Sequence, residues 1–243
     1  AKNEKSWKLR FHTQTAGCSL TAQQPENNIA RTGFQALAAV LGGTQSLHTN
    51  AMDETLALPT EKSAEIALRT QQLIAYETGA ASVVDPLGGS WYLEHLTDKM
   101  EQDVENYFLE IESLGGVIPA IEDGFFQREI SRSASEYQAK VDELKRIVVG
   151  VNKFEDKHDE IDIPLLNLNE DAGVNQINQL KILKKKRSQT NVNSILEKIT
   201  NACKNKDNLM PFIIAAAKEH ATIGEIIKAM KNEFGEWQET VGF

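Results

Sequence analysis

Cysteine, long apolar runs and positive charge are all scarce in this chain of 243 residues, and each shortage excludes a class of protein. The two cysteines, Cys18 and Cys203, have no neighbour at metal-ligand spacing, which argues against a zinc site or a disulfide framework. The sequence shows no signal peptide, so a reduced, cytoplasmic setting is expected. No apolar run approaches the ~20 residues that cross a bilayer. The net charge of −9 favours neither nucleic acid nor a membrane surface as a partner.

The motifs of several common enzyme chemistries are also missing. There is no glycine-rich dinucleotide motif, no phosphate-binding P-loop, no H-E-x-x-H metal motif and no nucleophile beside a base. We therefore expect this chain to supply neither a metal ligand nor a catalytic side chain of the acid–base kind. Its 41% hydrophobic and 25% charged residues are ordinary for a globular protein with a sizeable core.

What the chain does have is two polar segments punctuated by glycine. The first, RFHTQTAGCS, covers residues 10–19, and the second, GGTQSLHTN, covers residues 42–50. Each lies where a predicted strand runs into a loop, and an apolar-periodic helix follows each. This is the layout of consecutive βα units, whose ligand-binding groups sit at the carboxyl ends of the strands.

The hydrophobic pattern predicts three βα units over residues 8–114. Strands are expected at 8–14, 44–49 and 81–85. Helices are expected at 28–41 and 60–78, and a third helix is expected to end at Gly115–Gly116. Thr60 is expected to cap the second helix, and Gly42 and Gly79 to end the first and second. The first helix carries its expected apolar stripe on Ile29, Ala36, Leu37, Val40 and Leu41. The third carries it on Leu96, Met100, Val104, Phe108, Ile111 and Leu114.

After residue 116 the pattern becomes mainly helical. Helices are expected at 116–122, 125–146, 172–184, 190–205, 207–219 and 222–234, with a short extended piece at 147–152 and an acidic loop at 155–171. The chain thus divides into residues 1–115, three-eighths of a (β/α)8 barrel, and residues 116–243, a helical extension. A basic run at 181–187 is either a solvated helix face or a nucleotide or phosphate site.

The polar segments resemble the adenosylcobalamin-dependent acyl-CoA mutases, above all the large subunit of methylmalonyl-CoA mutase. The matching stretches are RFHTQTAGCSLTAQQPENN, LGGTQSLHTNAMDETLALPT, VDPLGGSWY at 84–92 and VVGVNK at 148–153. The resemblance covers nearly the whole chain. It implies an α/β fold, the C-terminal portion of a (β/α)8 TIM barrel followed by a mainly helical extension.

The resemblance also implies an activity. The family interconverts methylmalonyl-CoA and succinyl-CoA by a radical carbon-skeleton rearrangement, an isomerase reaction in which adenosylcobalamin carries the hard chemistry and the protein binds, orients and shields. Two alternatives stay open: a related mutase acting on isobutyryl-, ethylmalonyl- or 2-hydroxyisobutyryl-CoA, and a non-catalytic assembly module.

Residue roles follow from the same resemblance. It implies that His12, Gln14, Gln45 and Ser46 contact the acyl-CoA substrate. It implies that Gly17, Cys18, Glu54 and Ala57 approach the cobalamin, with Glu54 accepting a hydrogen bond from a corrin amide. Cys18 stands where many methylmalonyl-CoA mutases have tryptophan, which leaves room for a different acyl group.

Three further expectations concern neighbours of these residues. Strand alternation places Thr44 and Ser46 on one face and Gln45 on the other, unless a bulge intervenes. His48 is a weaker candidate for a ligand contact. It is expected either in the barrel interior or in contact with the residues that bind the ligand. Asp53 and Asp85 need only capping or turn roles.

The resemblance also indicates what lies elsewhere. The family motif D-x-H-x-x-G, whose histidine coordinates cobalt, does not occur here, and the first barrel half has no counterpart. Because three βα units cannot close a barrel, we expect a fragment or a split subunit. Its expected partners are the N-terminal barrel half and a cobalamin-binding domain or subunit, in a hetero-oligomer. The chain alone is expected to be inactive.

Overall fold

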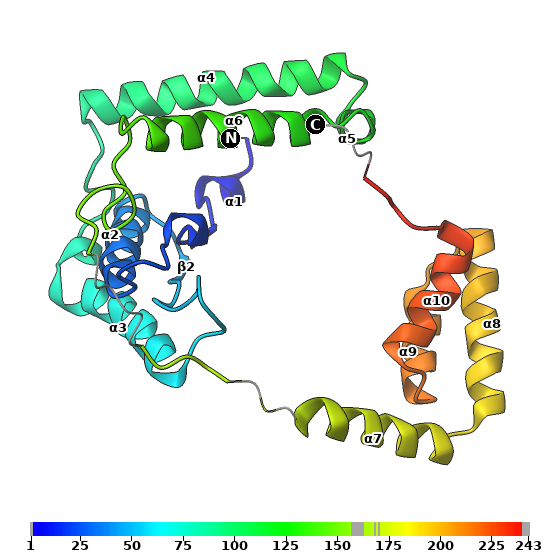
Figure 1. Ribbon diagram of the computed structural model, residues 1–243. Coiled ribbons are helices and arrows are strands. Elements are labelled where there is room, and N and C mark those ends of the chain that lie inside the picture. The colour runs from blue at the N-terminus through cyan, green and yellow to red at the C-terminus, as the bar shows by residue number, and fades with distance from the viewer. Residues whose placement is uncertain (1, 157–162, 168, 170, 240–243) are drawn as a thin grey trace. The chain divides into compact units, whose positions relative to one another are not determined.

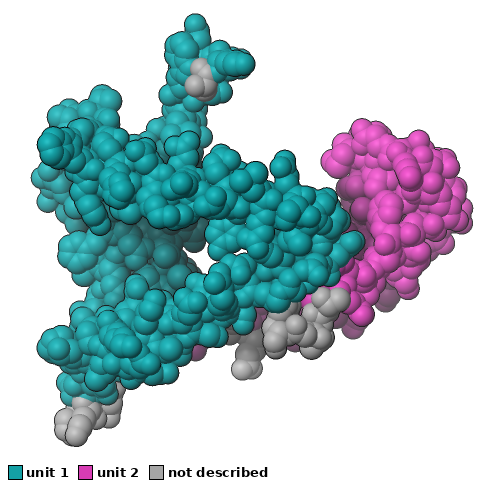
Figure 2. Space-filling model, turned by 90° about the horizontal axis from the view of Figure 1, so that it is seen from above, with its two compact units in different colours: residues 1–166, 243 teal, residues 167–242 magenta. Residues whose placement is uncertain are grey.

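The computed structural model describes residues 2–156, 163–167, 169 and 171–239 (Figure 1). The chain divides into two compact units, residues 1–166 and 167–242, which Figure 2 colours teal and magenta. Helices dominate both units, and the described residues contain one sheet, made of two parallel strands. Within these residues, no helix is both long and apolar enough to cross a membrane.

The sheet lies in the first unit and joins the two polar segments. Strand β1 (His12–Gln14) pairs in parallel with β2 (Ser46–His48), with His12 opposite Ser46 and Gln14 opposite His48. Both strands are shorter than the predicted 8–14 and 44–49. Leu9 has a φ of 34°, which interrupts the extended backbone before β1. Beyond β1, the Thr15 N–H still donates to the His48 carbonyl at 3.1 Å, so the pairing continues into the loops.

The first two predicted helices are confirmed. Helix α2 (Asn27–Leu41) follows β1, and α3 (Glu61–Glu77) follows β2. The Thr60 hydroxyl caps α3 by accepting a hydrogen bond from the Ser63 N–H, and Gly79, two residues beyond α3, has a left-handed φ of 70°. Gly42 is the C-cap of α2.

The buried face of α2 differs from the predicted apolar stripe. Its buried residues are Asn28, Thr32 and Ala36, one helical turn apart. Ile29 and Leu37, members of the predicted stripe, are only half-buried. Two polar side chains therefore face the interior. The Asn28 amide is hydrogen-bonded within the protein, whereas the Thr32 hydroxyl has no hydrogen-bond partner among the described residues.

The third predicted strand, 81–85, is wrong. Residues Ala80–Ser82 form a short 3-10 helix, η2, and Val83 is extended but 60% exposed and paired with no described strand. The 3-10 turn takes up Ala80–Ser82 and the backbone turns again at Asp85, whose φ is 47°, so only Val83 and Val84 remain between them. The first unit thus contains two βα units, and its place in a (β/α)8 barrel stays a prediction.

Three helices follow in the same unit: α4 (Trp91–Ser113), α5 (Val117–Glu122) and α6 (Phe125–Asp142). Helices α4 and α6 run side by side (Figure 1), and the Tyr107 hydroxyl of α4 donates to Glu129 Oε2 of α6 at 2.8 Å. Gly115 and Gly116 end the long helix as predicted, with φ of 95° and 104°. Helix α6 ends before the predicted residue 146, because the chain turns at Leu144, whose φ is 56°.

The apolar stripe of α4 is present but uncovered. No residue of α4 is buried, and the stripe residues Leu96, Met100, Val104 and Phe108 are 42–62% exposed. An amphipathic helix normally buries such a stripe against a neighbour. Within the described chain, α4 therefore exposes a face that is built for contact.

The predicted extended piece at 147–152 is instead a turn. The Gly150 N–H donates to the Lys153 carbonyl at 2.8 Å, and the Val151 N–H donates to the Val148 carbonyl at 3.0 Å. Gly150 has a φ of 80°, which extended backbone does not allow. Residues 157–162, 168 and 170 of the predicted acidic loop lie outside the described residues.

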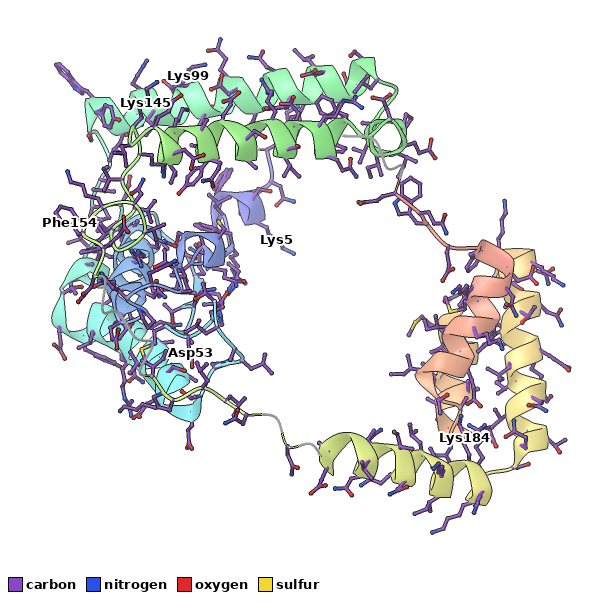
Figure 3. All side chains as sticks on the ribbon, in the orientation of Figure 1. Lys5, Asp53, Lys99, Lys145, Phe154 and Lys184 are labelled. Atoms are coloured by element: carbon purple, nitrogen blue, oxygen red, sulfur yellow. The ribbon has the colours of Figure 1, made fainter. Side chains whose placement is uncertain are left out.

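The second unit is helical throughout its described part. It contains α7 (Asp171–Lys186), α8 (Gln189–Asn205), α9 (Met210–Lys218) and α10 (Ile223–Phe234), all close to the predicted ranges. Its core is formed by Ile195, Ile199, Cys203, Ala216, Ile226 and Ala229. In the basic run, the α7 lysines, Lys184 among them (Figure 3), are exposed, whereas the Arg187 side chain is 2% exposed and paired with Glu225.

Candidate functional site

The sheet register brings three of the four predicted substrate residues onto one face. His12 and Gln14 are two residues apart on β1, and their partners Ser46 and His48 are two residues apart on β2. The four side chains therefore share one face of the sheet. His12 Nδ1 and Ser46 Oγ are 2.8 Å apart, within hydrogen-bond distance. All four residues are exposed, so the row is accessible to a ligand.

Gln45 stands apart from this row. Its side-chain carbonyl accepts a hydrogen bond from the Phe11 N–H at 2.9 Å, and its amide nitrogen donates to the Gly43 carbonyl. Gln45 thus binds main chain at the start of the two strands. Its contact with a substrate remains a prediction.

The predicted sharing of a face by Thr44 and Ser46 is wrong. The Thr44 hydroxyl accepts a hydrogen bond from the Thr13 hydroxyl at 2.9 Å, and Thr13 alternates with His12 along β1. Strand β2 begins only at Ser46, so its alternation does not extend back to Thr44.

Two of the predicted cofactor residues meet across different loops. A Cβ built on Gly17 would lie 2.5 Å from Glu54 Oε1. Glu54 Oε2 in turn accepts a hydrogen bond from Asn50 Nδ2, and the Thr15 hydroxyl donates to Asn50 Oδ1. Thr15 and Asn50 are 5% and 3% exposed, whereas Glu54 is exposed. A buried polar pair therefore fixes an exposed carboxylate beside the glycine.

Helix α2 holds the Gly17 turn from its other side. Residues Gly17–Ser19 form the 3-10 turn η1. Gln35 of α2 accepts a hydrogen bond from the Ala16 N–H at 2.6 Å and donates to Ser19 Oγ at 2.7 Å. The turn is thus fixed by a side chain that no local motif identifies.

The other two predicted cofactor residues face separate cavities. Ala57 lines a cavity of about 480 Å³ together with Glu54 and His48. Cys18 is exposed and lines a different groove of about 840 Å³, formed mainly by apolar residues of α6 such as Phe125. The structure therefore groups Gly17, Glu54 and Ala57, and it does not bring Cys18 into that group.

A charged cluster borders the Cys18 groove. The Tyr107 hydroxyl donates to Glu129, and Arg132 forms an ion pair with the same carboxylate. These hydrogen bonds lower the pKa of Glu129, and the bond to Glu129 raises the pKa of Tyr107. All three groups are open to solvent, so the cluster is an ordinary surface arrangement.

Asp53 has the structural role expected of it. It is fully buried in the loop between β2 and α3, where Figure 3 labels it. Its Oδ2 accepts hydrogen bonds from the Thr60 N–H at 3.0 Å and from the Ser63 hydroxyl at 2.6 Å. The carboxylate thus fixes the first turn of α3 and, with it, the end of the loop that carries Glu54.

Comparison with known proteins assigns this arrangement to a family. A family model described as methylmalonyl-CoA mutase matches residues 1–236. The chain belongs to the methylmalonyl-CoA mutase family. This confirms the resemblance seen in the polar strand ends.

Individual relatives of the methylmalonyl-CoA mutase family match along almost the whole chain. The 2-hydroxyisobutanoyl-CoA mutase large subunit of Aquincola tertiaricarbonis is 41% identical over 100% of this chain and 43% of its own length. The methylmalonyl-CoA mutase of Escherichia coli (strain K12) is 43% identical over 96% of this chain and 33% of its own length. The mitochondrial methylmalonyl-CoA mutase of Homo sapiens is 42% identical over 97% and 32%. The chain spans less than half of the length of these relatives.

Proposed function

We propose that this chain is part of an adenosylcobalamin-dependent acyl-CoA mutase that interconverts methylmalonyl-CoA and succinyl-CoA. The observation that carries the proposal is the contact of Gly17 with Glu54, which lies at the loop ends of the two strands that carry His12 and Ser46. Two groups of predicted ligand residues thus adjoin at one end of the sheet, as expected for ligand sites at the carboxyl ends of parallel strands.

In this proposal the strand face binds the acyl-CoA. His12 and Ser46, held 2.8 Å apart, present paired hydrogen-bonding groups, and Gln14 adds an amide on the same face. Gln45 acts from the edge of the row. Gln14, Gln45 and Ser46 are uncharged hydrogen-bonding side chains, which suits a site that positions a substrate and excludes water.

The Gly17 and Glu54 loops fit a large cofactor bearing amide groups. Among the described residues, Glu54 is hydrogen-bonded only through Oε2, so its exposed carboxylate retains acceptor capacity. Gly17 has no side chain and Ala57 has only a methyl group, which lets a flat ring approach the two loops closely, while Cys18 lines the separate groove and its cofactor contact stays a prediction. When bound, adenosylcobalamin supplies the radical chemistry of the rearrangement. The chain's own residues bind, orient and shield.

The similarity to one relative supports a second candidate substrate. The 2-hydroxyisobutanoyl-CoA mutase subunit matches this chain as well as the methylmalonyl-CoA mutases do, and it does so over the full chain. Cys18, small and exposed, is compatible with an acyl group of that kind. We therefore keep 2-hydroxyisobutyryl-CoA as the alternative substrate. The cytoplasm is the proposed location, and the partners are the remaining barrel strands and a cobalamin-binding domain.

The test is reconstitution. The chain is combined with the remaining segments of the mutase, adenosylcobalamin binding is followed by absorbance, and methylmalonyl-CoA and 2-hydroxyisobutyryl-CoA are offered in parallel. Conversion of methylmalonyl-CoA to succinyl-CoA that needs both the chain and the cofactor supports the proposal. Preferred conversion of 2-hydroxyisobutyryl-CoA assigns the alternative. Absence of cobalamin binding in the complete assembly contradicts both.

A further inference from the structure

The buried amide of Asn28 joins the two loops of the candidate site. Asn28 lies in the first turn of α2 and is 0% exposed. Its Nδ2 donates to the Thr21 carbonyl at 2.8 Å and to the Met52 carbonyl at 2.9 Å, and its Oδ1 accepts from the Thr21 N–H at 3.0 Å. Thr21 follows the Gly17 turn, and Met52 precedes Glu54. One side chain thus holds both loops.

Arg31, one turn further along α2, completes the arrangement. Its Nη1 donates to Asn28 Oδ1 at 2.8 Å and to the Thr21 hydroxyl at 2.9 Å. With this bond, both donors and both acceptor positions of the Asn28 amide are occupied. The other terminal nitrogen, Nη2, donates to the Val149 carbonyl at 2.8 Å. Arg31 therefore fixes the orientation of the amide and ties it to the turn at 148–153.

A second contact fastens the same turn. Gln24 Nε2 donates to the Phe154 carbonyl at 3.1 Å, and Figure 3 labels Phe154 beside α2. A Cβ built on Gly150 would lie 3.0 Å from the Gln24 side chain. Contacts between residues 21–31 and 148–154 therefore hold the outer end of the Asn28–Arg31 pair in place.

We propose that Asn28 and Arg31 are positioning residues that set the spacing between the Gly17 loop and the Glu54 loop, and thereby the affinity for cobalamin. The inference rests on the proposed function, in which these two loops face the cofactor. Neither residue contacts the His12–Ser46 row, so acyl-CoA binding should be left nearly unchanged. Buried amides that satisfy main-chain groups of two segments fix their separation, because breaking either bond leaves a buried group unpaired.

The substitution Asn28→Asp tests this link selectively. Aspartate keeps the shape of the side chain and can still accept from the Thr21 N–H and Arg31, but it loses both donors to the carbonyls of Thr21 and Met52. The matched control is Asn27→Asp. Asn27 lies in the same helical turn but is exposed, and among the described residues its side chain donates only to Gln24 Oε1, not to the Gln24 Nε2 that bonds Phe154. Both variants add a negative charge at the start of α2, so the helix-dipole effect cancels in the comparison.

Three measurements on the assembled, full enzyme decide the outcome. Hydrogen–deuterium exchange, recorded without ligand, should be faster in residues 17–21 and 50–57 of Asn28→Asp and unchanged in Asn27→Asp. Absorbance titration should give a cobalamin Kd raised about 10-fold, as expected for two lost hydrogen bonds in a buried site. The KM for the acyl-CoA should stay within about 2-fold, because no substrate contact changes.

Unchanged exchange in both loops overturns the inference, and so does faster exchange with an unaltered cobalamin Kd. Should Asn28→Asp fail to fold, Arg31→Lys carries the test. A lysine keeps the charge but cannot reach Asn28 and Val149 together, so the same loops should loosen to a smaller degree. If the wild-type enzyme binds no cobalamin at all, the proposed function fails, while loop exchange still decides whether Asn28 joins the loops.

Discussion

The carboxylate of Glu54 occupies the space that a side chain on Gly17 would need. A Cβ at residue 17 would lie 2.5 Å from Glu54 Oε1 and 3.3 Å from Asn50 Nδ2. A side chain at residue 17 would therefore have to displace the Glu54 carboxylate, which is the far end of an exposed side chain and is hydrogen-bonded to Asn50. The two residues belong to different βα loops, so a change at either one acts on the other.

This relationship predicts energetic coupling between the two residues. Gly17→Ala should raise the adenosylcobalamin Kd of the assembled enzyme about 10-fold, because overpacking typically costs about 1–3 kcal/mol. In the Glu54→Ala background the same substitution should cost much less, because the obstructing carboxylate is gone. A double-mutant cycle of cobalamin Kd values, measured by absorbance titration, gives the coupling. Additive effects would show that residues 17 and 54 act independently.

A second prediction concerns the substrate row. His12→Ala should reduce kcat/KM for the acyl-CoA by about 10-fold or more, as one lost hydrogen bond in a buried complex is worth about 1–3 kcal/mol. Ser46→Ala should have a smaller effect, and the double variant should resemble His12→Ala, because the two side chains contact each other at 2.8 Å.

The control for this pair is His95→Ala, which removes an exposed histidine of α4. It should leave the kinetics at the wild-type level. If His12→Ala lowers the affinity for cobalamin and leaves the acyl-CoA kinetics unchanged, the strand face is not part of the substrate site.

A third prediction separates stability from function at Asp53. Asp53→Ala should lower the free energy of unfolding by about 2–3 kcal/mol, because Oδ2 holds the Thr60 N–H and the Ser63 hydroxyl. Asp53→Asn should cost less than about 1 kcal/mol. It retains an oxygen that can accept from the Thr60 N–H and the Ser63 hydroxyl, while its amide nitrogen takes the place of Oδ1, which has no hydrogen-bond partner among the described residues. Denaturant titrations give both values, and equal losses would refute the capping role.

The fourth prediction is a pH dependence in the second unit. Hydrogen bonds from the Arg187 guanidinium, aided by Thr222, lower the pKa of Glu225 from 4.5 to about 2. Because the pKa is lower in the folded state, this stabilisation is fully present above the unfolded value and is lost as the pH falls from about 4.5 towards 2. The stability difference between the wild type and Glu225→Gln should therefore shrink across that range in acid titrations. An exposed glutamate, Glu197, provides the control substitution Glu197→Gln. A difference that is constant with pH would contradict the ion pair.

The fifth prediction concerns the chain by itself. It should show no turnover when adenosylcobalamin and acyl-CoA are supplied, and it should self-associate and bind a hydrophobic dye. The α4 residues Met100 and Phe108 are 62% and 56% exposed, and exposed apolar patches drive association. Sedimentation and dye fluorescence, repeated after the partner segments are added, should show both properties decrease. Turnover by the chain alone would overturn the proposed division of the site.

Local signals in the sequence were enough for most helices. The Thr60 cap, the glycine at 79 and the Gly115–Gly116 pair each identify a helix end through the backbone geometry that they favour. The strand predicted at 81–85 failed for the opposite reason. Strands depend on a partner, and the apolar pair Val83–Val84 contains no information about whether a neighbouring strand is present.

Only those site residues that lie in recognisable motifs could be predicted from the sequence. His12, Gly17 and Glu54 lie in recognisable segments, and Asn28 is the last residue of the first of these, whereas Arg31 and Gln35 lie outside them. Asn28 contacts Met52 across 24 residues, and Arg31 contacts Val149 across 118. Such bonds depend on the packing of α2 against the loops, and hydrophobic periodicity treats a buried asparagine as a surface residue. The available signal was the position of Asn28 at the end of a motif, on the same face of α2 as Thr32 and Ala36.

The Asn28 amide has a consequence for how such a site can change over generations. Of Met52 it binds only the carbonyl, and of Thr21 only the N–H and the carbonyl, groups that every residue except proline possesses. The bonds that Asn28 makes to the loops thus use loop atoms that mutation does not alter, unlike the side-chain bonds of Thr15, Ser19 and Glu54. Other side chains along the loops can be exchanged singly while the backbone that presents them keeps its place. A lineage with relatives named for two different acyl-CoA substrates would inherit, in this asparagine, a frame on which specificity can drift without loss of the fold.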